Sequence, residues 1–280
     1  MSRPNMAESI GHIKTLPTLP AVLSRIMATT ADPNASALDL SRHVASDQSL
    51  TATLLKLVNS AYYGHYRQID SITTAIVMLG FHEVRNLALA ATAFRTFPKG
   101  HPDFDRSQLW RHSLATAMAA ESLSKMVSAP TGGCFVSGLL HDIGKVALDV
   151  VHPRLFRDAA HQARAEARFI RETELEVLGL THAEAGGILA ERWDLPHAVV
   201  EAVRYHHEPE LGKLDSSLTT IIALADYVTY QAGLGESSNG RDPQYPDAAT
   251  LRLDEQGWTS VAQHLQQSGE RINDFVGILH

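Results

Sequence analysis

The sequence contains a single cysteine, Cys134, among its 280 residues. A framework of disulfides within the chain is therefore excluded, which is typical of proteins in a reducing compartment such as the cytoplasm. The first residues lack the apolar core of a secretory signal peptide, and no uninterrupted apolar run approaches the roughly 18–20 residues that a membrane-spanning helix needs. We therefore expect a cytoplasmic protein with no membrane partner.

Basic residues are also few. Lys and Arg number 24 against 31 Asp and Glu, which gives a formal net charge of −7, and no dense basic run occurs. An acidic chain of this kind is not suited to phosphate backbones, so nucleic acid is not an expected partner. Residues 71–89 mimic a helix-turn-helix around Gly80, but Arg85 is the one obvious base-reading side chain there, and in an acidic chain a packed helical hairpin explains the segment better.

Alternating, strand-like runs are scarce, and apolar residues recur instead at helical spacing. We expect an all-α, multi-helix bundle. A helical N-terminal subdomain is predicted over residues 1–105 and a second helical subdomain over residues 106–232, while residues 233–280 should form a loop and a C-terminal helix that docks on the body. Within the second subdomain, helices are predicted to begin near Leu109, Thr131, His152, Thr181, Pro196 and Ser216.

Histidine, in contrast, is abundant, with 15 residues. His141 and Asp142 are adjacent inside an apolar run, Gly138 to Lys145, that reads as helical. A carboxylate among core residues needs a partner, because burying an unpaired charge is very costly, and a metal ion would supply one. A single His-Asp pair occurs often by chance, so the assignment depends on further ligands.

Further candidates are His112, His182, His206, His207 and Asp226. Each also has a structural explanation taken alone: a hydrogen-bonded core histidine, a residue at the helix start that Thr181 and Glu184 cap, a cationic helix end, or a carboxylate paired with arginine. Together they indicate a site for one or two divalent ions. Imidazole and carboxylate ligands favour iron or manganese, with zinc or nickel as alternatives, and the lack of cysteine ligands argues against a structural zinc knot.

The order of these residues resembles the metal-binding pattern of the HD superfamily, especially its HD-GYP branch. The surrounding runs HDIGK, THAEAGGILAERWDLP, VRYHHEPE and ALADYV match as well. The resemblance implies two metal positions, with Asp142 bridging between them: one formed by His112, His141, Asp142 and Asp226, the other by Asp142, His182, His206 and His207. It also implies that Asp142 and Lys145 would carry any catalysis, since Lys145 matches a position near the phosphate. After Pro209 the chain reads ELGKLDSS in place of the DG-x-GYP loop, which argues against hydrolysis of cyclic di-GMP.

The N-terminal half resembles an HDOD domain through the runs LPTLPAVLSRI, ADPNASALDLSRHVASDQSLTATLLKLVNSAYYG and SITTAIVMLGFHEVRNLAL. The likeness extends over about residues 16–226 and implies an HD-domain-like helical fold. HDOD proteins are modules of bacterial signal transduction, mostly without demonstrated hydrolysis. We therefore expect a regulatory module that binds a signalling protein or a small nucleotide. The alternative is a metal-dependent phosphohydrolase, a phosphodiesterase acting on a nucleotide or cyclic dinucleotide. The sequence does not predict an oligomeric state.

Overall fold

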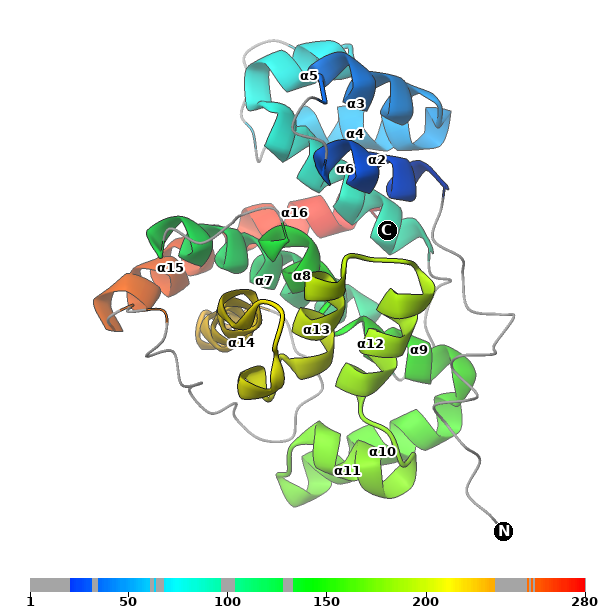
Figure 1. The fold of residues 1–280 in the computed structure, drawn as a ribbon, viewed down its shortest axis with the longest axis vertical. Helices are drawn as coiled ribbons and strands as arrows, with labels where there is room; N and C mark the ends of the chain where they lie inside the picture. Colours follow the sequence, from blue (N-terminus) through cyan, green and yellow to red (C-terminus); the bar gives the residue numbers. More distant parts are fainter. Residues whose placement is uncertain are drawn as a thin grey trace. The chain divides into compact units, whose positions relative to one another are not determined.

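The computed structural model describes residues 21–31, 35–60, 63, 68–96, 104–127, 133–234, 251, 253 and 255–279. All regular elements in these ranges are helices, so the all-α prediction is confirmed (Figure 1). Among the described residues, no helix combines the length and the apolar character that crossing a membrane requires. Most of the predicted loop that begins at residue 233 lies outside the described residues, which resume at position 251.

The chain divides into two compact units. The first unit comprises Met1–Leu16 and Lys99–Gln267, and the second comprises Pro17–Pro98 and Ser268–His280. The tail expected as one helix forms two, of which the first belongs to the first unit and the second to the other. The break falls at Ser268 and Gly269, residue types with low helix propensity that favour helix boundaries.

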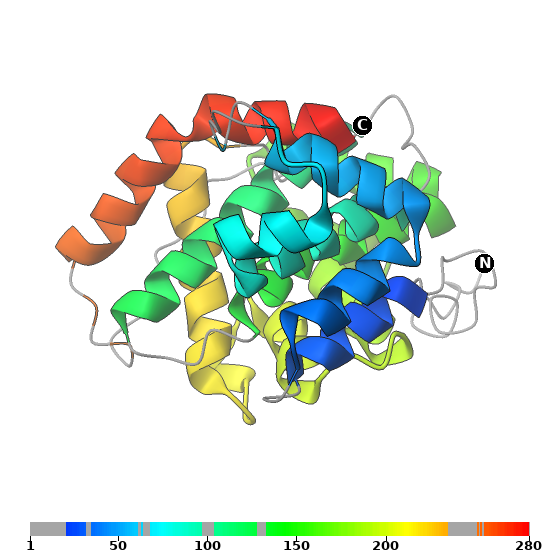
Figure 2. The same ribbon diagram turned by 90° about the horizontal axis from the view of Figure 1, so that it is seen from above.

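Short capped helices build the second unit. Its helices are α2 Ala21–Ala31, α3 Ala37–Ala45, α4 Gln48–Val58, α5 Ile72–Leu79, α6 Phe81–Thr96 and α16 Gly269–Leu279. Ser36 and Asp39 form a capping box at α3, and the side chains of Asp47 and Ser71 cap α4 and α5. Figure 2 shows α16 beside α4, which it contacts together with α6. The last turns of the chain thus complete a helical cluster that begins near the N-terminus.

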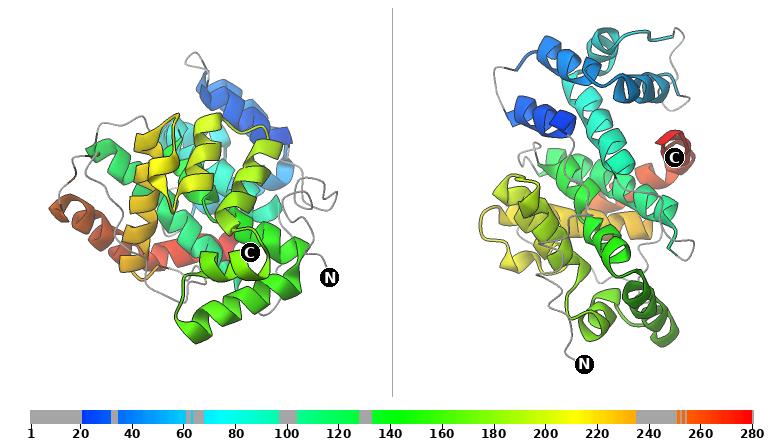
Figure 3. Two further views of the ribbon diagram at one scale, coloured as in Figure 1. Left: turned by 60° about the horizontal axis from the view of Figure 1, so that its bottom comes forward. Right: turned by 90° about the vertical axis from the view of Figure 1, so that its right-hand side faces the viewer.

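A long helix, α7, organises the first unit. The helices of this unit are α7 Arg106–Met126, α8 Cys134–Leu140, α9 Ile143–Val151, α10 Pro153–Glu166, α11 Ile170–Val177, α12 His182–Arg192, α13 His197–Tyr205, the 3-10 helix η1 Pro209–Leu211, α14 Ser216–Gln231 and α15 Glu255–Gln267. Helices α8, α14 and α15 pack on α7, whereas α12 packs on α9 and α13. Helices α10 and α11 lie against each other (Figure 3).

Two glycines allow helices in this unit to approach closely. A Cβ atom added at Gly138 of α8 would lie 2.7 Å from the Cα atom of Ala117 in α7. A Cβ atom at Gly144 of α9 would overlap the carbonyl oxygen of His182 and lie 2.6 Å from the backbone nitrogen of Gly186 in α12. Real Cβ atoms do not come this close to backbone atoms. The two crossings therefore require glycine, and they hold the turn between α8 and α9 against its neighbours.

That turn differs from the sequence prediction. The run from Gly138 to Lys145 is not one helix, because α8 ends at Leu140 and α9 begins at Ile143. Asp142 occupies the N-cap position of α9, yet its side chain makes no capping hydrogen bond. The carboxylate is turned instead toward a group of histidines in the interior of the unit.

Candidate metal centre

The structure brings together all seven residues for which the sequence predicts metal binding. They come from five segments: His112 from α7, His141 and Asp142 from the turn after α8, His182 from the first turn of α12, His206 and His207 from the end of α13, and Asp226 from α14. His207 is partly exposed and the other six are buried. The capping box of Thr181 and Glu184, predicted from the sequence, is present and starts α12 at His182.

His112, His141 and Asp226 form one group of potential ligands. The Nε2 atom of His112 lies 2.8 Å from Oδ1 of Asp226, and Nε2 of His141 lies 3.8 Å from the same oxygen. One ligand atom from each residue lies within 4.8 Å of those of the other two. Two imidazole nitrogens and a carboxylate oxygen at this separation suit an intermediate divalent metal ion.

His182, His206 and His207 form a second group, whose ligand atoms also lie within 4.8 Å of one another. The Nε2 atoms of His182 and His207 are 2.9 Å apart. The ring centroids of His206 and His207 are separated by 4.1 Å, so these consecutive residues reach the same point from adjacent directions. Three imidazoles gathered at one point make this group a second potential cation site.

Asp142 stands between the two groups. Its Oδ2 atom lies 3.5 Å from Nε2 of His141. Its Oδ1 atom lies 3.3 Å from Nε2 of His182 and 3.8 Å from Nε2 of His206. The carboxylate therefore faces an imidazole of the first group and two of the second, and ligand atoms of His141, Asp142 and His206 also lie within 4.8 Å of one another. Asp142 could thus serve both potential cation positions.

Hydrogen bonds on the far side of the rings orient three of the histidines. Nδ1 of His141 lies 2.8 Å from the carbonyl oxygen of Gly138, and Nδ1 of His206 lies 2.8 Å from that of Val203. Because a carbonyl oxygen only accepts, Nδ1 carries the proton in both rings and Nε2 offers a lone pair to the cluster. Both Nε2 atoms are buried and have no hydrogen-bond partner among the described residues. Buried lone pairs of this kind fit a bound cation.

The third oriented histidine depends on Glu174 of α11, a residue that the sequence analysis missed. Oε2 of Glu174 lies 2.7 Å from Nδ1 of His182 and accepts the backbone N–H of His182 at 2.8 Å. Glu174 is fully buried. In the run RETELEV it lies between the exposed Glu172 and Glu176, so the sequence gives no sign that it is buried. Helical spacing was the available signal, since Glu174 lies four residues after the buried Ile170 and four before the buried Leu178.

Lys145 pairs with the bridging carboxylate. Its Nζ atom lies 2.7 Å from Oδ2 of Asp142, and the lysine side chain is only 1% exposed. The lysine thus compensates the charge of Asp142 inside the protein. Its role beside a phosphate stays a prediction.

The protonation states of the cluster suit metal ligands. Burial lowers the pKa of His141 despite the neighbouring carboxylates, and burial together with nearby imidazoles lowers the pKa of His206 to about 3. The pKa of His207 falls well below its ordinary value for the same reasons. Burial raises the pKa of Asp142, but Lys145 and the surrounding histidines outweigh it and hold that pKa well below the usual range. At neutral pH these imidazoles are uncharged and this carboxylate is ionised, as metal binding requires.

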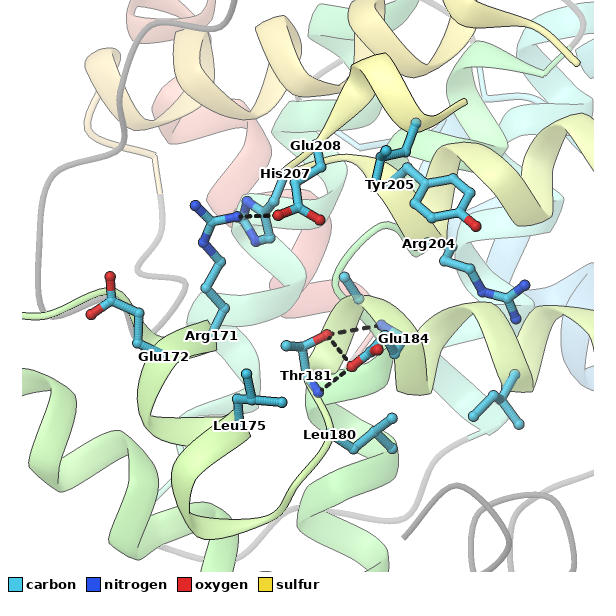
Figure 4. A pocket seen from close by; sticks show the side chains of 13 residues that line it. Arg171, Glu172, Leu175, Leu180, Thr181, Glu184, Arg204, Tyr205, His207 and Glu208 are labelled. Carbon is cyan, nitrogen blue, oxygen red and sulfur yellow. Dashed lines mark hydrogen bonds and ion pairs between the residues drawn. The ribbon is translucent and has the colours of Figure 1, made fainter. Parts of the chain in front are cut away.

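A cavity of about 630 Å³ borders the cluster at His207 (Figure 4). Leu175 of α11, Leu180 between α11 and α12, and Leu211 of η1 supply apolar surface. Arg171, Arg204 and Tyr205 line the cavity as well. Nη1 of Arg171 lies 3.6 Å from Oε1 of Glu208, the residue that directly follows His207. The lining carries two arginines against three glutamates, so its own fixed charges do not favour an anion.

Comparison with known proteins places the chain in a family context. The family model described as "HDOD domain" matches residues 16–209. An uncharacterized protein of Treponema pallidum (strain Nichols) is 29% identical over 272 residues, which are 95% of this chain and 52% of that protein. The chain therefore spans about half the length of the curated relative it matches.

Solved structures show the same architecture. An HDOD domain protein of unknown function from Geobacter sulfurreducens superposes with a TM-score of 0.81 at 26% identity, covering 98% of this chain and 97% of that one. A protein from Marinobacter aquaeolei, provisionally assigned to signal transduction, gives a TM-score of 0.79 at 25% identity, covering 94% and 60%. A Shewanella amazonensis protein, provisionally assigned as a phosphohydrolase, gives 0.77 at 21% identity, covering 99% of each chain, and supports the fold alone.

Proposed function

The chain belongs to the HDOD domain family, and from this premise we propose that it is a signal-transduction module of a bacterial cytoplasm that binds divalent metal in its His/Asp cluster. One observation carries the proposal: the buried carboxylate of Asp142 faces imidazoles of both ligand groups. Iron or manganese suits these ligands best, with zinc or nickel as alternatives. The module would act by binding a signalling protein or a small nucleotide.

The two proposed metal positions share Asp142. His112, His141 and Asp226 would hold one ion with it, and His182, His206 and His207 would hold the other. A bound divalent ion supplies Lewis acidity, which polarises a phosphoryl oxygen or a water molecule. The protein residues supply orientation, since backbone carbonyls and Glu174 fix three of the rings.

The positions of these ligands in the chain support a regulatory role. They belong to five segments spread from α7 to α14, so one or two ions would connect segments that are distant in the sequence. A metal ion that binds only the folded site stabilises the folded state relative to the unfolded chain. Metal loading would therefore change the rigidity of the whole first unit, and a partner that contacts this unit would respond to it.

Elemental analysis of anaerobically purified protein tests the proposal. We expect one or two equivalents of transition metal in the wild type and loss of at least one equivalent in Asp142→Asn, which keeps the shape of the side chain but not its charge. Asp158→Asn is the matched control, because Asp158 is an exposed residue of α10. Equal metal content in the wild type and Asp142→Asn, with both folded by circular dichroism, would contradict the proposal.

A second candidate function is a metal-dependent phosphodiesterase, and the cavity at His207 favours it. A substrate in this cavity would reach the edge of the cluster, where Asp142 would hold the metal and Lys145 would help to neutralise a phosphate. The test is turnover of a chromogenic phosphodiester, of nucleotides and of cyclic dinucleotides with Mn²⁺ or Fe²⁺. If the wild type turned over these substrates no faster than Asp142→Asn, the phosphodiesterase function would be excluded. The proposal of metal binding would not be affected by that result.

A further inference from the structure

The candidate metal centre is nearly closed to solvent, so an ion needs a route into it. Six of its seven residues are buried, and His207 is the one that is partly exposed. His207 is also the one member of the cluster that lines the cavity of about 630 Å³. The side chain of Asp226 is 11% exposed, so a route beside Asp226 is the alternative to a route through this cavity.

The fixed charges that line the cavity favour a cation, because three glutamates stand against two arginines. Three of these five groups are held by other partners. Glu184 belongs to the capping box of α12, and Glu172 pairs with Arg168 at 3.2 Å. Arg204 donates a hydrogen bond to Glu191 at 2.9 Å, and neither Arg168 nor Glu191 lines the cavity. The other two groups pair with each other.

That pair, Arg171 and Glu208, lies beside His207 (Figure 4). Nη1 of Arg171 and Oε1 of Glu208 are 3.6 Å apart, and the two side chains are 35% and 56% exposed. An ion pair with this separation and exposure contributes little to stability, so its side chains separate readily. Because Glu208 directly follows His207, the pair connects α11 to the segment that carries the exposed ligand.

From this arrangement we propose that divalent metal ions enter and leave the cluster through the cavity, and that the ion pair of Arg171 and Glu208 controls their passage. The inference rests on the proposed metal binding. When the pair opens, the carboxylate of Glu208 binds the incoming ion and transfers it to the neighbouring imidazole of His207. Carboxylates and imidazoles both bind iron and manganese, so the ion passes between compatible ligands.

The two side chains of the pair act on an incoming cation with opposite sign. Glu208 attracts the ion, whereas the guanidinium of Arg171 repels it. A unit charge about 7 Å from the path of a divalent ion changes the rate of entry about sevenfold in water at low ionic strength. Screening at physiological salt reduces this factor to about twofold. Removal of either charge should therefore change the rate of metal uptake, and the change should depend on salt.

Stopped-flow mixing of the full chain, stripped of metal by a chelator, with Mn²⁺ and a fluorescent indicator of free metal tests the proposal. At low ionic strength we expect uptake about sevenfold slower in Glu208→Gln and about sevenfold faster in Arg171→Gln than in the wild type. Both differences should shrink to about twofold at physiological salt. A loosened fold would speed uptake at every ionic strength, so the salt dependence separates the two causes.

Glu210→Gln is the matched control, because Glu210 is an exposed glutamate two residues beyond Glu208 that does not line the cavity. Its uptake rate should lie closer to that of the wild type than to that of Glu208→Gln. Equal rates in Glu208→Gln and Glu210→Gln at low ionic strength would overturn the inference and favour the route beside Asp226. A smaller amount of Mn²⁺ bound by Glu208→Gln at saturation would also overturn it, since Glu208 would then be a ligand of the resident ion. If the wild type takes up no Mn²⁺, the proposed metal binding itself is wrong and this inference fails with it.

Discussion

Replacing Glu174 by glutamine should weaken metal binding although Glu174 is not a predicted ligand. One oxygen of this carboxylate lies within hydrogen-bond distance of both the ring Nδ1 and the backbone nitrogen of His182. In Glu174→Gln the amide oxygen can keep both contacts, but the negative charge is lost. The charge matters because it raises the basicity of the imidazole and holds its Nε2 toward Asp142, 3.3 Å away.

The size of the effect follows from the surroundings of the second carboxylate oxygen. Oε1 of Glu174 is buried and has no hydrogen-bond partner among the described residues. The new NH₂ group would occupy that place without an acceptor. Mutation of a group that hydrogen-bonds the outer nitrogen of a metal-bound histidine typically costs 10–100-fold in affinity, which corresponds to roughly 1.4–2.7 kcal/mol. We expect a decrease in that range for Mn²⁺ or Fe²⁺.

Competition with a metal-sensitive fluorescent chelator measures this affinity directly. Glu172→Gln is the matched control, because Glu172 lies one half-turn away on the same helix with a side chain that is 44% exposed. If Glu174→Gln binds metal as tightly as Glu172→Gln and the wild type, Glu174 does not position His182 for a metal. A decrease in thermal stability without a change in affinity would likewise assign Glu174 a purely structural role.

Three further predictions concern the cluster and its packing. The free energy of unfolding, measured with a chelator present, should fall as the pH drops below about 6.5, by about 2 kcal/mol at pH 5 from His206 alone. Burial lowers the pKa of His206 in the folded protein to about 3, so the unfolded chain takes up the proton first. A urea midpoint that stays constant between pH 7.5 and 5 would refute this prediction. Gly144→Ala should destabilise the protein by about 1–3 kcal/mol and weaken metal binding, since the new Cβ overlaps the carbonyl oxygen of His182; an unchanged urea midpoint would show that the crossing tolerates a methyl group. Lys145→Met should lower the free energy of unfolding of the metal-free protein by about 3–5 kcal/mol, because it leaves Asp142 without its ion-pair partner. Mn²⁺ should restore most of the loss in melting temperature. A melting temperature that Mn²⁺ does not raise would place the metal away from Asp142.

The composition of the cluster could be predicted from the sequence because its residues are chemically conspicuous. Charged or imidazole side chains such as Asp142 and Asp226 stand in apolar runs, where burial without a partner is costly. The capping box at Thr181 could be predicted for a related reason, because its hydrogen bonds join residues only three positions apart. Features that depend on local spacing, or on a polar residue in an apolar run, can be predicted from the sequence alone.

The features that the sequence did not reveal depend on pairing between distant segments. The turn at His141 is hidden because apolar residues continue on both sides of it at helical spacing. The contact of Glu174 with His182 joins α11 to α12. The sequence alone does not distinguish a glutamate that has a buried partner from one exposed to solvent. The ion pair between Arg106 of α7 and Asp149 of α9, with a nitrogen–oxygen distance of 2.6 Å, escaped prediction for the same reason.

The charge of the cluster links its metal content to what its neighbouring cavity can bind. Asp142, Asp226 and Glu174 contribute three carboxylates to the cluster and its contacts and Lys145 contributes one ammonium group, so these four groups together carry about two negative charges. Two divalent ions would leave an excess of positive charge in a buried site, which is unfavourable unless an anion accompanies them. The cluster meets solvent-accessible space at His207, beside a cavity whose own lining has more glutamates than arginines. An anion should therefore enter that cavity only when metal is bound, and the number of ions would decide whether the module responds to it.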